Sequence, residues 1–330
     1  MRAPGFWRPG DPTALARLLQ PIGALYGATT ARRMARPGAR AAAPVVCVGN
    51  FVAGGAGKTP AAIALARMLI DEGKRVAFLS RGYGGAKREE PVRVDPNVDD
   101  ARTVGDEPLL LGRVAPCWVG ADRVRGAAMA IDAGAQVLLL DDGLQNPALA
   151  KDLALAVVDG VERFGNGLCI PAGPLRAPVA AQAPHVQGFI VIGGDEAAAL
   201  AISAAAPGKP ILSASLEPDA LAAAPLIGRE VVAFTGIARP EKFYATLRRV
   251  GAQLLATRDF PDHHLFTQRE IEALIEEAAQ RGALLATTEK DRARLTRRQA
   301  QAVVTLPVTL RFDEPAAVRE MLKAALRSAA

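Results

Sequence analysis

Cysteine and histidine are scarce in this chain of 330 residues, which contains three of each. Cys47, Cys117 and Cys169 are far apart and form no CxxC pair, so a disulfide framework and a zinc knuckle are both disfavoured. Isolated thiols of this kind are typical of buried positions in a reducing compartment. Aromatic residues make up only 5% of the sequence and no base-stacking motif is present, so we expect no nucleic-acid partner.

Long apolar runs are also missing. No segment offers the roughly 18 consecutive apolar residues of a membrane-spanning helix. Arginine and proline interrupt the N-terminal region, which therefore lacks the layout of a secretory signal. Half of the residues are hydrophobic and 22% are charged, as in a globular protein with a sizeable core. The length favours about two domains.

Positive charge is concentrated at the N-terminus. Residues 1–40 contain seven arginines and one acid, Asp11, so this segment carries +6 and the other residues sum to zero. A basic segment of this kind can meet nucleic acid or an anionic membrane surface.

Residues 13–27 are predicted to form an amphipathic helix, which Pro21 is expected to kink or split. Phe6 and Trp7 precede the segment and arginines follow it, as in helices that lie in a membrane interface. A helix packed on its own domain shows the same pattern, so both interpretations stand at this point. The apolar stripe consists of Leu15, Leu18, Leu19, Ile22, Leu25 and Tyr26.

Strands and helices alternate from Val45 onward. A β run at 45–48, a glycine-rich loop, a helix at 60–70 and a strand at 76–79 make a βαβ unit, which implies parallel strands. The first domain, residues 1–208, is therefore predicted to contain an open parallel sheet with helices on both faces. Its further strands are expected at 117–119, 137–140, 153–158 and 189–192.

A second set of elements begins after prolines crowd the chain near residue 209. It predicts a smaller α/β domain over 209–312 and a last helix within 313–330. Strands are expected at 211–216, 231–234, 254–256, 284–287 and 303–310, and helices at 241–250, 268–281 and 315–325.

The loop GGAGKT follows a strand and opens a helix, which is the context of a P-loop. Glycines let backbone N–H groups approach phosphate oxygens, Lys58 reaches the β- and γ-phosphates, and the hydroxyl of Thr59 ligates Mg²⁺. Val52 replaces the first glycine of the general pattern. The residues expected to bind the nucleotide are Gly54, Gly55, Ala56, Gly57, Lys58, Thr59 and Pro60.

Two pairs of carboxylates suit this loop. Asp141 and Asp142 end an apolar strand, as the metal-binding acids of P-loop proteins do. Asp106 and Glu107 lie in the segment GDEP before a helix. On spacing alone, Asp106 and Glu107 indicate the start of a helix, because negative charges in the first turn are stabilised by the helix dipole. The alternative is a carboxylate base for a hydroxyl nucleophile, with its neighbour near Mg²⁺.

Other polar segments leave alternatives open. Arg81, in SRGYGG, and Arg123 both follow strand ends, where an arginine is either a phosphate ligand or part of a surface turn. His263 and His264 are adjacent, so at most one is central to a site, and too few soft ligands surround them for a metal. The segment TTEKD at 287–291 is typical of a helix cap.

Together these motifs resemble the tetraacyldisaccharide 4'-kinase family, the lipid A 4'-kinases. They occur in the family's order over nearly the whole chain. They are VGN at 48–50 with the loop GGAGKTP, SRGYGG at 80–85, GDEP at 105–108, GADR at 120–123, DDGLQN at 141–146, PAGPLR at 171–176, DFPDHH at 259–264 and TTEKD at 287–291.

The resemblance implies a kinase that uses ATP and Mg²⁺ to phosphorylate the 4'-hydroxyl of tetraacyldisaccharide 1-phosphate, giving lipid IVA in lipid A (lipopolysaccharide) biosynthesis. It also implies a P-loop NTPase-type domain, a smaller α/β domain and a two-stranded linker, here at 210–217 and 304–312. The last helix then returns to the first domain. A tetraacylated substrate favours membrane contact by the N-terminal helix, at the cytoplasmic face of the bacterial inner membrane.

Roles carried over by motif make Asp106 the general base and His263 its partner. Lys58, Asp141 and Asp142 complete the catalytic set, and Thr59, Glu107 and Asp141 the metal set. The family usually has phenylalanine and histidine where this chain has Leu144 and Asn146, so no titrating group stands at position 146. The residues expected to contact the substrate are Asn50, Arg81, Tyr83, Arg123 and Gln145.

Two other functions compete with this one. A regulatory P-loop ATPase docked on membranes shares the loop, but Ala53 stands where such proteins have an additional lysine. A soluble kinase or ligase for a small metabolite leaves the basic N-terminal segment unexplained. Neither the sequence nor the resemblance indicates an obligate protein partner.

Overall fold

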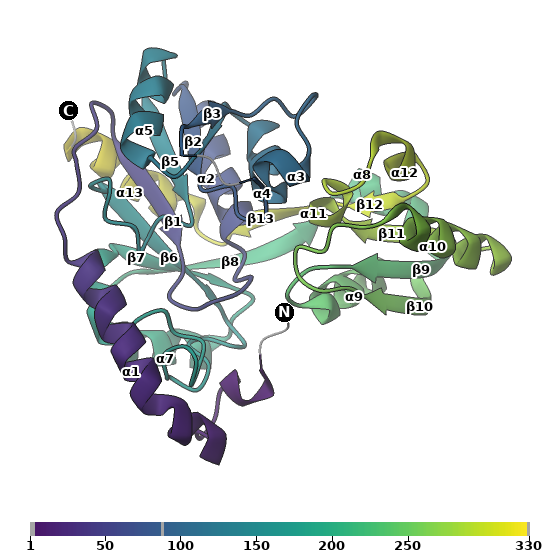
Figure 1. The fold of residues 1–330 in the computed structure, drawn as a ribbon, viewed down its shortest axis with the longest axis horizontal. Coiled ribbons are helices and arrows are strands. Elements are labelled where there is room, and N and C mark those ends of the chain that lie inside the picture. The colour runs from purple at the N-terminus through teal and green to yellow at the C-terminus, as the bar shows by residue number, and fades with distance from the viewer. Residues whose placement is uncertain (1–3, 87–88, 329–330) are drawn as a thin grey trace.

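The protein, in a computed structural model that describes residues 4–86 and 89–328, is built on two sheets (Figure 1). The strands of the larger sheet are β1 (Val45–Gly49), β2 (Val76–Ser80), β3 (Val92–Arg93), β4 (Cys117–Val119), β5 (Val137–Asp141), β6 (Leu153–Asp159), β7 (Gly188–Ile192), β8 (Ile211–Pro218) and β13 (Val308–Phe312). Their order is β13-β8-β7-β6-β1-β5-β2-β4-β3. All neighbours pair in parallel except β3 with β4 and β13 with β8.

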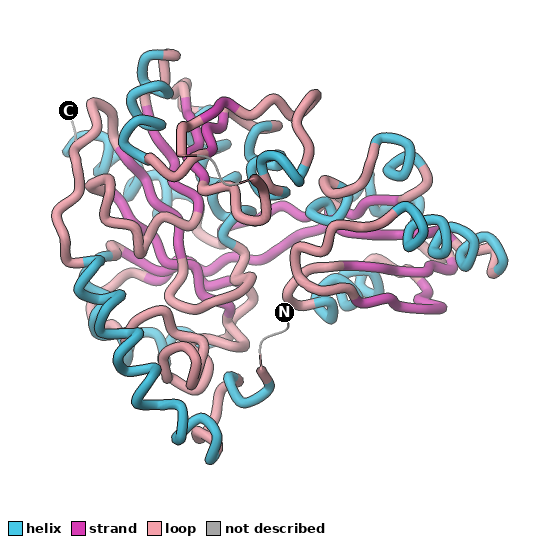
Figure 2. Tube along the Cα trace, viewed as in Figure 1, coloured by secondary structure: helices cyan, strands magenta, loops and turns pink. Residues whose placement is uncertain are grey.

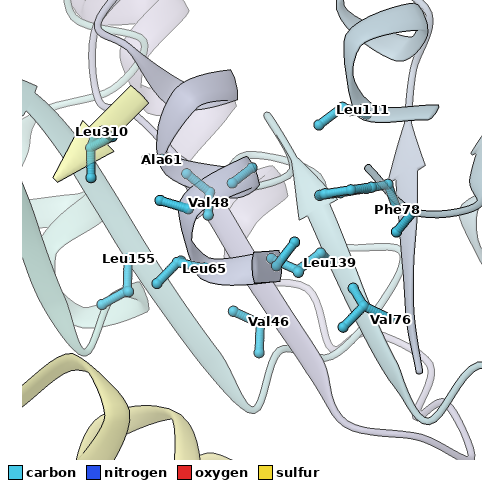
Figure 3. Packing of buried hydrophobic residues seen from close by; sticks show 14 of the residues in the cluster. Val46, Val48, Ala61, Leu65, Val76, Phe78, Leu111, Leu139, Leu155 and Leu310 are labelled. Carbon is cyan, nitrogen blue, oxygen red and sulfur yellow. The ribbon is translucent and has the colours of Figure 1, made fainter. Parts of the chain in front are cut away.

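The central strands are short apolar runs whose residues are buried on both faces, which is why they form a covered parallel sheet. Side chains alternate between two cores. Val46 and Val48 of β1 pack in one (Figure 3), whereas Val45 and Cys47 pack in the other. Helices therefore cover both faces, and the predicted P-loop NTPase-type fold class is confirmed.

The helices of this large domain belong to one core or the other. α2 (Lys58–Asp71), α4 (Asp106–Gly112) and α13 (Pro315–Ser328) contribute to the core around Val46, and α5 (Arg123–Asp132) and α7 (Glu196–Ala205) to the core around Cys47. α3 (Ala101–Val104) precedes α4, and α6 (Val179–Gln182) lies beside α1 (Ala14–Met34).

The smaller sheet consists of β9 (Glu230–Thr235), β10 (Gln253–Asp259), β11 (Leu284–Thr288) and β12 (Val304–Leu306), all parallel, in the order β10-β9-β11-β12. Its helices are α8 (Ala220–Ala223), α9 (Pro240–Arg249), α10 (Gln268–Gln280), α11 (Glu289–Arg292) and α12 (Arg297–Gln301). Two apolar clusters, one with α9 and one with α10, lie on its two faces. This is the expected smaller α/β domain.

β8 and β13 connect the two domains as an antiparallel pair (Figure 2). The single strand expected at 303–310 is a wrong prediction, because Pro307 separates β12 in the small sheet from β13 in the large sheet. Proline has no N–H to continue a ladder, so a change of sheet at this residue is physically reasonable. After β13, Val318 and Leu322 of α13 pack in the core of the large domain. The boundaries 1–208, 209–312 and 313–330 stay a prediction.

α1 is one continuous helix through Pro21, so the expected split is absent. A proline removes one hydrogen bond of the helix ladder, and the rest of that ladder holds. Thr13 caps its start by accepting the N–H of Ala16. The helix packs through its small residues. A Cβ added to Gly23 would lie 2.5 Å from the carbonyl oxygen of Cys169, and a Cβ added to Gly27 would lie 2.7 Å from Sγ of the same residue.

The predicted apolar stripe of α1 points away from the protein. Leu18 is 76% exposed, Leu25 68% and Ile22 59%. The interpretation in which this stripe packs on the helix's own domain is therefore wrong, although the opposite face of the helix does pack there. None of the helices within the described ranges 4–86 and 89–328 is long and apolar enough to cross a membrane.

Candidate active site

The P-loop joins β1 to α2, and its shape depends on glycine. Gly54 and Gly57 have φ of +108° and +89°, which side-chain-bearing residues rarely adopt. A Cβ on Gly57 would also lie 2.6 Å from Cδ1 of Ile192. Lys58 begins α2, and its Nζ donates to the carbonyl of Gly54 at 3.4 Å. The backbone N–H groups at this helix start and the ammonium of Lys58 form an anion-binding site.

Asp141, at the end of β5, is bonded to the P-loop helix, because Oγ1 of Thr59 donates to its Oδ2 at 3.0 Å. In the described part of the chain, Oδ1 of Asp141 is buried without a hydrogen-bond partner. Burial, together with the negative charges of Glu107 and Asp142, raises the pKa of Asp141 to about 7, although the charge of Lys58 opposes this. A carboxylate in this position favours a cation beside it.

A divalent cation fits these oxygens. Mg²⁺ is commonly held by one or two carboxylates together with substrate phosphates, so few protein ligands suffice. No group of three or more His, Cys, Asp or Glu within the described residues could hold a metal ion. Thr59 and Asp141 supply hard oxygen ligands at the P-loop, and Glu107 is near enough to affect the pKa of Asp141.

Asp142 has a φ of +55° and an ion pair with Arg176, whose Nη2 lies 3.1 Å from its Oδ2. Nζ of Lys58 is 3.8 Å from the same oxygen. Burial alone would raise the pKa of Asp142, but Lys58 and Arg176 outweigh it and hold the pKa below its usual range. Arg176 also donates to the carbonyl of Val52 at the start of the P-loop. The sequence signal for Arg176 was its place in PAGPLR, but no role was predicted for it.

Asp106 and His263 meet across the domains. Nδ1 of His263 lies 3.1 Å from Oδ2 and 3.2 Å from Oδ1 of Asp106. Asp106 is also the first residue of α4, and its Oδ1 accepts the N–H of Glu107 at 2.8 Å. The helix-start interpretation of Asp106 is therefore confirmed, and its role as a base stays a prediction. The ring of Tyr83 packs edge-on against His263 at 4.9 Å.

Two cationic side chains of the small domain, Lys290 and Arg294, also contact this site. Nζ of Lys290 lies 3.0 Å from Glu107 and 3.4 Å from Nε2 of His263, and Nε of Arg294 donates to Oδ2 of Asp106 at 2.6 Å. Burial opposes the charged form of Asp106, but the hydrogen bond from His263 and the charges of Lys290 and Arg294 hold its pKa well below the usual range. Burial likewise disfavours charged Lys290, yet Glu107 and Asp106 raise its pKa.

The cap interpretation of TTEKD is confirmed, because Thr288 accepts the N–H of Asp291 at the start of α11. No pattern in the sequence indicates a role for Arg294 or the pairing of Lys290 with Glu107. Both contacts join segments more than 180 residues apart.

The predicted substrate residues divide into two groups. Arg123 is buried at the start of α5, and burial together with the charge of Arg81 lowers its pKa to about 10. Arg81 is exposed after β2, and Tyr83 is 66% exposed beside His263. By contrast, Asn50 and Gln145 are buried. Nε2 of Gln145 donates to the carbonyl of Asn50, and Nδ2 of Asn50 donates to the carbonyl of Gly54, so both amides support the P-loop. Their contact with the substrate stays a prediction.

A cavity of about 450 Å³ lies between the domains and includes the P-loop. This volume is within the range of roughly 300–1,000 Å³ that small-molecule sites occupy. Charged residues Lys58, Glu107, Asp262 and Lys290 lie in its lining. Its apolar lining includes Ile63, Leu110, Val114, Leu216, Phe243 and Val308.

A second cavity, of about 330 Å³, extends from the other side of the P-loop to Trp7 in the N-terminal segment. Asp159 and Arg239 line it and form an ion pair at 2.8 Å across the domains. Gly55 and Arg239 line both cavities. The P-loop is therefore accessible from two sides.

A parallel α/β sheet with this loop and with strand-end acids beside it places the protein in the P-loop class. A carboxylate that accepts the proton of the attacking hydroxyl is a recurring part of kinase sites, and Asp106 is the candidate for that part here. A family model described as tetraacyldisaccharide-1-P 4'-kinase (LpxK) matches residues 15–327. The chain belongs to this family of kinases.

Relatives agree with this assignment over 95–99% of their length. The chain is 56% identical over 331 residues to the tetraacyldisaccharide 4'-kinase of Methylobacterium sp. (strain 4-46), covering 100% of this chain and 99% of the relative. It is 49% identical to the protein of that name from Rhodopseudomonas palustris, with coverage of 98% and 95%. A crystal structure of LpxK from Aquifex aeolicus in complex with ATP superposes with a TM-score of 0.73 at 25% identity, covering 94% of this chain and 99% of that one.

Proposed function

We propose that this protein transfers the γ-phosphoryl group of ATP to the 4'-hydroxyl of tetraacyldisaccharide 1-phosphate, giving lipid IVA for lipid A biosynthesis. One observation carries this proposal beyond family membership. Asp106, paired with His263, is adjacent in sequence to Glu107, whose charge raises the pKa of Asp141 at the P-loop. A base for a hydroxyl and the acids that serve a phosphate-bound metal are therefore in one site.

ATP occupies the cavity of about 450 Å³ in this proposal. Its phosphates bind the P-loop from Gly54 to Pro60, where backbone N–H groups and Lys58 offset their charge. The apolar lining, which includes Ile63, Leu110 and Phe243, provides a surface for the base. The solved relative that binds ATP supports this assignment.

Mg²⁺ would be held by Thr59 and Asp141, with Glu107 close by. Bound there, it neutralises charge on the phosphates and helps to orient them. The unpartnered Oδ1 of Asp141 and the raised pKa of this carboxyl support the assignment.

Asp106 orients the acceptor hydroxyl and accepts its proton, and His263 fixes the carboxylate. A positioned base of this kind contributes roughly 10²–10⁴ in rate. Lys58 and Asp142 complete the catalytic set at the P-loop. Arg123, buried with its charge beside Arg81, suits an anionic or sugar part of the substrate, and exposed Tyr83 lies next to the base pair.

The acceptor carries four acyl chains, so the enzyme must work at a lipid surface. The exposed face of α1 supports such contact, because Leu18, Ile22 and Leu25 point away from the protein. Arg32 and Arg33 in the last turn of the helix add positive charge for anionic lipids. We therefore place the protein as a peripheral enzyme at the cytoplasmic face of the bacterial inner membrane.

The test is transfer of ³²P from γ-labelled ATP to tetraacyldisaccharide 1-phosphate in detergent micelles. We expect labelled lipid from the unaltered protein and from Lys74→Ala, in which an exposed lysine just after α2 is removed, and none from Lys58→Ala. ATP turnover without labelled lipid, despite a well-dispersed acceptor, would overturn the proposal in favour of an ATPase or a different acceptor.

A further inference from the structure

Arg294 connects the small domain to the proposed base. It follows α11, its side chain is 1% exposed, and its Nε donates to Oδ2 of Asp106, 188 residues away in the chain. Nη2 lies against the same oxygen in an ion pair. A buried guanidinium needs such anionic partners, because its charge cannot be removed by deprotonation.

Arg294 is held in place by its own domain. Its Nη1 donates to the carbonyl of Gly236 at 2.8 Å and to Oδ1 of Asp291 at 3.0 Å. Asp291 in turn accepts hydrogen bonds from Oγ1 of Thr235, from the N–H of Gly236 and from Oγ1 of Thr288. The arginine is thus fixed within the small domain, and Asp106 is the partner that comes from the large domain.

The two oxygens of Asp106 have different surroundings. Oδ2 faces Nε and Nη2 of Arg294, whereas Oδ1 accepts the N–H of Glu107 at 2.8 Å. Nδ1 of His263 reaches both oxygens. Nδ1 of His263 is nearer to Oδ2, at 3.1 Å against 3.2 Å for Oδ1, so Nε of Arg294 and this donor fill the roughly two acceptor positions of Oδ2. Oδ1 then accepts the N–H of Glu107 and keeps its second position for a further donor.

We propose that Arg294 is a positioning residue for phosphoryl transfer, which binds Oδ2 of Asp106 so that Oδ1 faces the acceptor hydroxyl. The inference rests on the proposed function. In the transfer step the O–H bond of the acceptor breaks and its proton goes to Oδ1. The hydroxyl oxygen forms the bond to the γ-phosphorus, and the bond to the bridging oxygen breaks to release ADP.

A purely structural role of the salt bridge between Arg294 and Asp106 would have different consequences from a positioning role. Loss of a structural contact lowers stability without acting specifically through Asp106. Loss of positioning lowers kcat, because a displacement of about 1 Å at a reacting group costs about 10²-fold in rate. It leaves the KM for ATP unchanged, since Arg294 does not line the nucleotide cavity.

The test compares kcat and KM for ATP in Arg294→Gln, Arg294→Lys and a control, Arg298→Gln, which removes an exposed arginine of neighbouring α12. We expect kcat to fall about 10²-fold in Arg294→Gln and about tenfold in Arg294→Lys, whose single ammonium cannot reproduce the planar guanidinium. The KM for ATP should stay within about twofold, and the control should match the unaltered protein.

A double-mutant cycle with Asp106→Asn separates positioning from folding. If Arg294 acts through Asp106, Arg294→Gln lowers kcat no further in the Asp106→Asn background. Additive losses, or an unchanged kcat in Arg294→Gln, would overturn the inference. Should Arg294→Gln fail to bind nucleotide, Arg294→Lys decides, and an unaltered kcat in that variant overturns it. Failure of the unaltered protein to label lipid would instead refute the proposed function.

Discussion

Nδ1 of His263 lies 3.1 Å from Oδ2 of Asp106, although 157 residues separate them in the chain. Asp106 begins α4 of the large domain, and His263 follows β10 of the small domain. The pair forms only where the domains meet, so the relative position of the domains determines whether His263 reaches Asp106.

Asp106→Ala is expected to lower kcat by about 10²–10⁴ while the affinity for ATP stays within about threefold, because a base contributes to transfer and not to nucleotide binding. Transfer to lipid and calorimetric binding of ATP measure the two effects. His263→Gln should lower kcat less, and His264→Gln, whose ring pairs with Glu270, serves as its control. Loss of ATP binding in Asp106→Ala would contradict its assignment as the base.

Asp141→Asn is expected to weaken binding of ATP with Mg²⁺ at least tenfold, and to leave binding of ATP in EDTA unchanged or stronger. The substitution removes a hard ligand and also a negative charge beside the phosphates. Because the pKa of Asp141 is about 7, the Mg²⁺-dependent affinity of the unaltered protein should rise with pH between about 6 and 8. Titration calorimetry at several pH values measures both effects.

The control for this experiment is Asp132→Asn, which alters an exposed acid at the end of α5 and should leave the affinity and its pH dependence intact. An unchanged affinity for ATP with Mg²⁺ in Asp141→Asn would show that this carboxylate does not serve the metal.

We predict that the contact of Asp159 with the small domain weakens in acid. Its side chain is 4% exposed and pairs with Arg239 and Lys242 of the small domain. Burial would raise its pKa, but the hydrogen bond from Lys242 and the charges of both cations lower it below the value of 3.8 of an unperturbed Asp. The folded state therefore binds this proton less readily than the unfolded state, so the pair stabilises the fold above about pH 4 and less as the pH falls.

Asp159→Asn should accordingly lower the free energy of unfolding by about 1–3 kcal/mol at pH 7. The difference from the unaltered protein should shrink as the pH falls below about 4. Urea titrations across this range give the result, with Asp71→Asn, an exposed acid of α2, as control. A difference independent of pH would mean that the pair contributes no charge-dependent stability.

The exposed stripe of α1 predicts binding to lipid vesicles. Leu18→Gln with Leu25→Gln should lower the partition coefficient at least tenfold, because each leucine contributes roughly 1.5–3 kcal/mol when buried. Deletion of residues 1–30 should release the protein entirely. Sedimentation with vesicles of anionic lipid is the measurement.

Ala24→Gln with Ala28→Gln is the matched control, since both positions are exposed on α1 but lie outside the stripe. We expect it to sediment like the unaltered protein, and high salt to weaken both by screening the arginines. Equal sedimentation of the leucine variant and this control would exclude the stripe as the membrane contact.

Much of the fold could be predicted because its signals are local. Short apolar runs bounded by glycine, proline or acid correspond to β1, β2 and β5 within a residue or so of their observed ends. The P-loop was also local, since six consecutive residues specify its chemistry. The two-residue strand β3 was missed, because it is too short to give a periodic pattern.

Contacts between distant segments could not be predicted from the residues. Arg294, Lys290 and Arg239 are ordinary basic residues in the sequence, and their partners belong to another domain. The orientation of α1 on the domain could not be predicted from periodicity either, because periodicity identifies an apolar face but not the face that packs. The face that packs is set by the close approach of Gly23 and Gly27 to Cys169, and small residues give only a weak hydrophobic signal in the sequence.

The antiparallel pair of β8 and β13 has a consequence for synthesis of the chain. β13 and α13 follow the whole small domain in sequence, yet both complete the large domain: β13 forms the edge of its sheet, and Val318 and Leu322 fill its core. During translation the large domain therefore keeps apolar surface uncovered after β8 has been made, until about 110 further residues, through the end of α13 at Ser328, have emerged. The small domain, whose last strand β12 ends at Leu306, is therefore complete before the large domain that carries the P-loop.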